Sequence, residues 1–217
     1  MRTHSARLAI AAMMVLGAQT VQAQTGPTDP CAGAGADRCA APLRSAAYIS
    51  QIGQANTAVI SQDSTAQTAR VKQNGGELSA RVTQRGPGIA YLEIDQAGLL
   101  NTFVSNQNSA DGGSNVVVAA QQGEGNAILL DQSAVAGSVN TAMLAQQGTG
   151  NQMQLGQNGS DNRAELVQLG DNNAMTATQN GSTNQLRWVQ NGNGLSDLQI
   201  VQSGNQAMSI TQSNGGT

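Results

Sequence analysis

The residues with the best spacing for catalysis are two carboxylates, Glu93 and Asp95. Paired carboxylates hydrolyse glycosidic bonds when they face each other across a cleft. Residues two apart on a strand instead point to the same side, and Arg70 and Lys72 occupy the matching positions one repeat earlier. We therefore predict that these four side chains form charge pairs on an outer face, with a polysaccharide-acting enzyme kept as a remote alternative.

Two further features could bind a ligand. The run Asp111-Gly112-Gly113 suggests calcium, but the glycine-aspartate nonapeptide of calcium-binding β-rolls does not recur. Trp188 could stack on a sugar if it were exposed, but its place in the repeat described below predicts burial. We predict a turn at residues 111–113 and a core residue at position 188, with no metal and no cofactor.

The first 23 residues have the pattern of a cleaved secretory signal peptide. Arg2 and Arg7 precede an apolar run over residues 8–18, and residues 21–23 end in a small residue, Ala23. An apolar run of this length is too short to span a bilayer. We predict cleavage after Ala23 and a secreted protein that is not embedded in a membrane.

Charge and composition exclude several functions for the mature chain. Without Arg2 and Arg7, the 10 basic and 13 acidic residues become 8 and 13, a net charge of −5, which disfavours nucleic-acid binding. The single histidine, His4, is removed with the signal peptide. A Ser-His-Asp or Cys-His catalytic group is then impossible, and most histidine metal sites are excluded.

Residues 24–44 form a predicted flexible leader that contains both cysteines. Cys31 and Cys39 are separated by seven residues, and prolines and glycines surround them. This is not the C-x-x-C spacing of thiol oxidoreductases, and exported proteins favour disulfides. A local disulfide between the two is the expected arrangement.

The remainder of the chain is organised by regularly spaced glutamines. Aromatic residues make up 2% of the sequence, so a disordered polar chain and a thin-cored β structure both fit the composition. The anchor glutamines are Gln51, Gln62, Gln73, Gln84, Gln96, Gln107, Gln121, Gln132, Gln146, Gln157, Gln168, Gln179, Gln190, Gln202 and Gln212.

The steps between anchors fall into two classes. The next anchor comes eleven positions after each of Gln51, Gln73, Gln96, Gln121, Gln146 and Gln168. The steps from Gln62, Gln84, Gln107, Gln132, Gln157, Gln179 and Gln202 vary from ten to fourteen. The unit is therefore two half-repeats of about 22 residues, and internal repeats of this length are typical of solenoids.

Polar and apolar residues alternate before each anchor. The position six residues before an anchor holds Asn56, Asn101, Asn115, Asn126, Asn140, Asn151, Asn162, Asn173 and Asn184. The positions four and two before an anchor are apolar, as in Leu198 and Trp188, with Ser105 as the exception. A period of two predicts a β-strand with one buried face.

Glycine follows most anchors by two residues and predicts a tight turn after each strand. These turn glycines are Gly53, Gly75, Gly86, Gly98, Gly123, Gly148, Gly159, Gly170, Gly181, Gly192 and Gly204. We predict an all-β solenoid of about seven strand-turn-strand repeats, built as two facing parallel sheets. In it the Asn and Gln side chains stack on their equivalents and form hydrogen-bonded amide ladders that would direct self-assembly.

This pattern resembles the curlin repeat of curli subunits, which are secreted bacterial proteins that polymerise into functional amyloid. The motif S-x5-Q-x-G-x2-N-x-A-x3-Q is present in full as Ser45, Gln51, Gly53, Asn56, Ala58 and Gln62. The resemblance covers residues 45–212. It implies a fibre subunit, no enzymatic activity, export through a dedicated outer-membrane channel with accessory proteins, and roles in biofilm matrix and adhesion.

The chain also departs from the curlin pattern. It has about seven repeats where curli subunits typically have five, and Gln67, Leu78 and Ala90 occupy asparagine positions. Irregular, basic early repeats are more similar to the minor, nucleating subunit than to the major one. The partner is then another copy or another curlin subunit, and a monomeric solenoid adhesin is the alternative. Because residues 213–217 add no helix or charged cap, we expect the last strand to stay open to pairing.

Overall fold

A computed structural model describes residues 45–214, which fold into fifteen β-strands. The predicted signal peptide and the leader with both cysteines lie outside the described residues. The strands are β1 (Ala46–Gln54), β2 (Thr57–Gln62), β3 (Gln67–Gly76), β4 (Ser79–Arg85), β5 (Ile89–Leu99), β6 (Thr102–Ser109), β7 (Ser114–Glu124), β8 (Ala127–Ala134), β9 (Val139–Thr149), β10 (Gln152–Ser160), β11 (Arg163–Leu169), β12 (Ala174–Ser182), β13 (Gln185–Asn191), β14 (Ile200–Ser203) and β15 (Ala207–Ser213).

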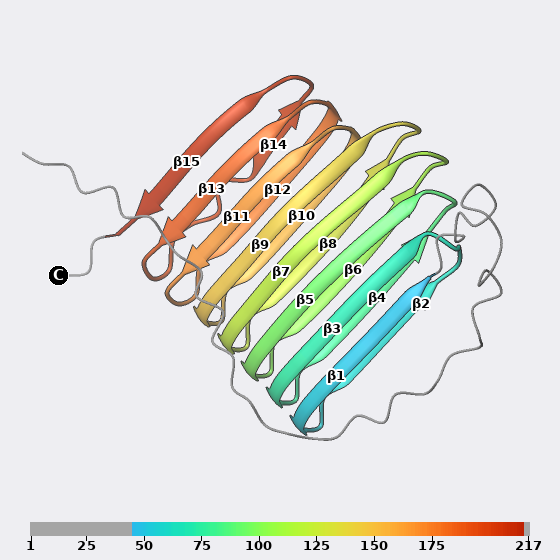
Figure 1. The fold of residues 1–217 in the computed structure, drawn as a ribbon. Helices are drawn as coiled ribbons and strands as arrows, with labels where there is room; N and C mark the ends of the chain where they lie inside the picture. The colour runs from blue at the N-terminus through green and yellow to red at the C-terminus, as the bar shows by residue number, and fades with distance from the viewer. Residues whose placement is uncertain (1–44, 215–217) are drawn as a thin grey trace, which may run out of the picture. The chain divides into compact units, whose positions relative to one another are not determined.

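The strands alternate between two facing sheets (Figure 1). Odd-numbered strands form an eight-strand sheet in chain order, and even-numbered strands form a seven-strand sheet. Every recorded strand pair is parallel and joins strands two apart in the chain, such as β1 with β3. The predicted solenoid of about seven turns is confirmed. Within residues 45–214 no helix has the length and apolar character needed to cross a membrane.

The interior consists of one layer of inward-facing side chains from each sheet. Pleating sends alternate residues to the core, so the apolar positions four and two before most anchors pack between the sheets. Phe103 and Trp188 are the largest of these side chains, and both are fully buried. The prediction that Trp188 belongs to the core is confirmed.

For most of the length of the solenoid, insertions are confined to the turns along one of its two sides. The turns from the eight-strand sheet to the seven-strand sheet have nearly constant length, whereas the return turns vary. Asp111 and Gly112 lie in one of these longer return turns, between β6 and β7, as predicted. All anchor glutamines nevertheless align across neighbouring strands, because extra residues in a turn leave the strand register unchanged.

One strand from each sheet makes up a rung of the solenoid. The last full rung, β13 with β14, departs from this rule. The step from Gln190 to Gln202 is twelve residues, and the extra residue lies within the strand region before β14. Gln199 there has a left-handed backbone (φ 50°), and Leu198 is 47% exposed. The prediction that Leu198 faces the core is therefore wrong, because a bulge changes the side to which residues before it point.

Ser105 on β6 is the one buried side chain in residues 45–214 that has a polar atom without a hydrogen-bond partner. Its neighbours in register are Val82 and Leu130. We expect Ser105→Ala to raise the free energy of unfolding by about 1 kcal/mol, because it removes an unsatisfied buried hydroxyl. The measurement is the denaturant concentration at which the β-sheet signal in circular dichroism is lost.

Ser109 on the same strand provides the matched control. Its hydroxyl is equally buried, but it donates a hydrogen bond to the carbonyl oxygen of Ile89 at 2.8 Å and accepts one from Asn115 at 2.9 Å. Ser109→Ala should lower the stability. If both substitutions destabilise the protein equally, the Ser105 hydroxyl forms a hydrogen bond in solution, and the prediction is wrong.

Candidate functional site

The anchor glutamines form two unbroken ladders, one within each sheet. Each Nε2 donates a hydrogen bond to the Oε1 of the anchor one rung further along the chain, at 2.6–3.1 Å. The eight-strand sheet carries the ladder through Gln51, Gln73, Gln96, Gln121, Gln146, Gln168, Gln190 and Gln212. The seven-strand sheet carries the ladder through Gln62, Gln84, Gln107, Gln132, Gln157, Gln179 and Gln202.

Each ladder also ties the two sheets together. The Nε2 of Gln168 donates a second hydrogen bond to the carbonyl oxygen of Gln152, at 3.0 Å, and Gln152 lies on the opposite sheet. Gln190 does the same with Ala174, at 2.8 Å. A glutamine is therefore suited to this place because one amide can donate along the stack and across it at once.

The repeated asparagines hold the turns of successive rungs together. The Oδ1 of Asn126 accepts a hydrogen bond from the backbone N–H of Asn151 at 3.1 Å, and its Nδ2 donates to the carbonyl oxygen of Gly148 at 2.8 Å. Both partners belong to the next rung. The same Nδ2-to-glycine contact is made by Asn56, Asn101, Asn140, Asn151, Asn162 and Asn173.

All eleven predicted turn glycines have a positive φ. In most of them the backbone of one turn also lies directly against the turn of the next rung. A Cβ added to Gly98 would lie 2.0 Å from the carbonyl oxygen of Gly123. These positions therefore require glycine for the close stacking of the turns as well as for the conformation of each turn.

A second left-handed position, not predicted from the sequence, lies four residues after an anchor. Ala55, Glu77 and Leu100 occupy it with φ of 54–57°, and Gly125 and Gly150 occupy it in later rungs. Residues other than glycine are strained in this conformation, so each of them has a small energetic cost there. Such residues recur at the same position in later turns, as Asp161, Asn172 and Thr183. The recurrence of glycine at Gly125, Gly150 and Gly194 is the signal that could have revealed it.

Some repeats have another residue in place of the recurring asparagine, and these replacements are of two kinds. Gln67 retains the polar function: its Oε1 accepts the backbone N–H of Asp63 at 3.0 Å, and its Nε2 donates to the carbonyl oxygen of Gly86 at 3.1 Å. Leu78 and Ala90 are fully buried and apolar. The early rungs therefore rely on apolar packing where the later rungs use stacked asparagines.

The four charged residues predicted to pair lie on β3 and β5 and align on the outer face of the eight-strand sheet. Arg70 pairs in register with Glu93, with Nη1 and Oε1 3.7 Å apart, and Lys72 lies in register with Asp95. The predicted neighbours are confirmed, although the structure records an ion pair for the first couple alone. Burial, together with the hydrogen bond that its hydroxyl donates to Glu93 at 3.1 Å, raises the pKa of Tyr91.

We expect Glu93→Gln to change the free energy of unfolding by less than about 1 kcal/mol. The pair is solvent-exposed, and its attraction is screened by water and salt. The measurement is the denaturant midpoint at low and at high salt. A loss of several kcal/mol would mean that the pair is a main determinant of strand register.

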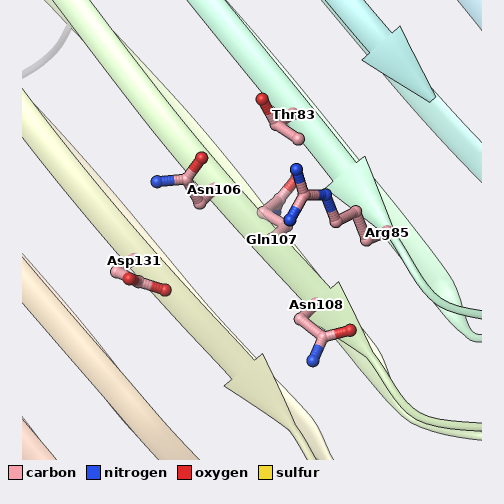
Figure 2. A pocket seen from close by; sticks show the side chains of 6 residues that line it. All are labelled: Thr83, Arg85, Asn106, Gln107, Asn108 and Asp131. Carbon is pink, nitrogen blue, oxygen red and sulfur yellow. The ribbon is translucent and has the colours of Figure 1, made fainter. Parts of the chain in front are cut away.

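A hollow of about 380 Å³ lies on the seven-strand sheet. It extends over β4, β6 and β8 (Figure 2). Its lining is Thr83, Arg85, Asn106, Gln107, Asn108 and Asp131. One carboxylate is present, so the hollow lacks the pair that glycoside hydrolysis requires. Residues 45–214 also contain no group of three or more side chains suited to hold a metal ion.

Two facing parallel sheets with an amide ladder in each define a β-solenoid repeat protein. The family model of the curlin associated repeat matches residues 137–170, which span β9, β10 and β11. This part of the chain therefore carries the curlin associated repeat. No curated protein and no solved structure was found to match it.

Proposed function

We propose that this chain is a secreted structural subunit that self-assembles into curli-type amyloid fibres at the bacterial surface, where the fibres support biofilm matrix and adhesion. The observation that carries the proposal is the continuity of the two glutamine ladders up to the outermost strands. At one end, the Oε1 atoms of Gln51 and Gln62 accept no hydrogen bond from another anchor. At the other end, the Nε2 atoms of Gln202 and Gln212 donate to backbone carbonyl oxygens and have no further anchor as acceptor.

The end strands supply the surfaces that a second copy would cover. Their inward side chains are part of the core pattern, yet Ile49 is 44% exposed and Met208 is 40% exposed. Strands at the edge of a sheet also carry unpaired backbone donors and acceptors, which recruit further strands. Stacked identical amides and in-register parallel strands are the features that stabilise cross-β fibres.

The family supports the remaining parts of the proposal. Curlin proteins are structural subunits of extracellular fibres, so we place this chain outside the cell and assign it no catalytic role. We propose that its partners are further copies or another curlin subunit, and that an outer-membrane channel with accessory proteins exports it. The charged and irregular first rungs favour the minor, nucleating subunit.

The test is assembly of the purified mature chain, without denaturant or cofactor. We expect soluble protein to convert into fibres that bind an amyloid dye, with fibre diffraction at about 4.8 Å along the axis and about 10 Å across it. Electron microscopy should show unbranched fibres. A folded monomer that persists for days at micromolar concentration would contradict the proposal.

One observation favours the monomeric adhesin as the second candidate. Before β14 the seven-strand sheet carries a bulge, and the carboxylate of Asp197 accepts the backbone N–H of Thr176 at 2.8 Å. Bulges and charged side chains at a sheet edge are devices by which monomeric proteins avoid further pairing. The same assembly experiment decides between the two functions.

A further inference from the structure

The two end strands of the described solenoid, β1 and β15, lie in the same sheet. Fifteen strands alternate between the sheets, so the eight-strand sheet contributes the first strand and the last. Successive strands are related by half a turn about the stacking axis. Short turns join the facing strands, which therefore run in opposite directions (Figure 1). Adding another strand after β15 in the same pattern would require it to lie in the seven-strand sheet.

Two head-to-tail arrangements of identical copies are possible. Without rotation, β15 pairs with β1 of the next copy, and a space one strand wide remains between β14 and β2 of that copy. With a rotation of half a turn, β1 of the next copy pairs with β14, and β2 pairs with β15. The rotation also reverses strand direction, so all pairs remain parallel and no strand position is left empty.

We infer that successive copies in the fibre are rotated by about half a turn, so that β14 receives β1 and β15 receives β2 of the next copy. This inference rests on the proposed function, because it describes the junction between subunits. An empty strand position would leave the backbone groups of two sheet edges without partners at every junction. The rotated junction pairs both edges.

The side chains at the two ends are complementary in this arrangement. The Nε2 of Gln212 meets the Oε1 of Gln62 in the next copy, and Gln202 meets Gln51, so both ladders continue with the donor direction that they have inside one copy. The partly buried Ile210 then packs beside Ile60 of the next copy, one core position from the ladder.

The bulge before β14 limits one half of the junction. Regular pairing on β14 covers Ile200–Ser203, whereas β15 is regular over Ala207–Ser213 and matches the six residues of β2. The β15–β2 contact is therefore the longer of the two. It is also the contact that distinguishes the rotated junction from the unrotated one, in which β15 meets β1.

Disulfide trapping tests this contact directly in the full chain with Cys31→Ser and Cys39→Ser. Thr211 and Ser61 are exposed, and each precedes an anchor by one residue. In the rotated junction these two residues of neighbouring copies are in register at about 4.8 Å, within the range for a disulfide. Ser50 precedes Gln51 in the same way and is the matching residue for the unrotated junction.

We expect oxidised fibres of the Thr211→Cys, Ser61→Cys variant to yield a ladder of covalent oligomers on a denaturing gel. Fibres of the Thr211→Cys, Ser50→Cys variant should yield monomers, because in the rotated junction these residues lie on opposite outer faces. A ladder from the second variant, or from neither variant, overturns the inference while fibre formation upholds the proposed function. If the parent chain forms no fibres, the proposed function itself fails.

Helical reconstruction of fibres from the unsubstituted chain provides an independent measurement. The rotated junction predicts a rotation near 180°, added to the twist of the solenoid, with a rise of about 36 Å per copy from fifteen half-rungs. The unrotated junction predicts no such rotation and a rise of about 38 Å from eight rungs. A reconstruction of the second kind would also overturn the inference.

Discussion

Gly123→Ala is expected to lower the free energy of unfolding by about 3 kcal/mol or more and to prevent normal fibre formation. Gly123 has a φ of 118°, and an added Cβ would lie 2.0 Å from the carbonyl oxygen of Gly148 in the next rung. Both atoms belong to rigid backbone, so the clash can be relieved only if the turns move apart. Circular dichroism in denaturant measures the stability, and an amyloid dye follows assembly.

Gly125→Ala in the same turn is the matched control. Gly125 also has a positive φ, 63°, but no atom lies within 4 Å of the added Cβ. The expected cost is therefore the conformational strain alone, about 1–2 kcal/mol. If the two substitutions have equal effects, close stacking of the turns does not require glycine at position 123.

The second large effect is expected from replacing Gln168 and Gln190 together with alanine. Gln146 would lose the acceptor for its Nε2, at present 2.8 Å away, and the carbonyl oxygens of Gln152 and Ala174 would lose their donors. Each buried group left without a partner costs about 1–3 kcal/mol. We therefore expect a loss of about 3 kcal/mol or more, and a much longer lag before fibres appear at matched concentration.

The control for the glutamine pair is Thr176→Ala combined with Thr178→Ala. Both threonines are on β12, face outward and are partly exposed, and their side chains make no recorded hydrogen bond. Changes at such positions usually stay within about 0.5 kcal/mol. Equal lag times for the glutamine and threonine variants would show that the amide ladder does not drive assembly.

The inward and outward faces of the strands were predictable from the sequence. Strand pleating has a fixed period of two, so the apolar positions before Gln73 and Gln96 could point to the core only together with their anchors. The wrong prediction for Leu198 has the same origin. Counting backward from Gln202 assumes an unbroken strand, and the bulge at Gln199 breaks it.

The contacts of the candidate site were only partly predictable. Repeating glutamines and asparagines indicated stacked amides, because residues at equal offsets meet in a solenoid. Their detailed roles differ: Gln168 crosses the interior to Gln152, whereas Asn126 joins two turns. A linear sequence cannot distinguish these roles, since each partner belongs to another strand and its carbonyl direction depends on the fold.

The amino-acid sequence was sufficient to predict the 22-residue unit, the strands and, outside the region before β14, their buried faces, because these depend on local alternation and on glycine. The direction of the hydrogen bonds in the ladders, the close approach of Gly123 to Gly148 and the presence of both end strands in one sheet became known from the three-dimensional arrangement. These features arise between rungs. Groups about 22 residues apart become neighbours only when the stack has formed, and their energies depend on that stacking distance.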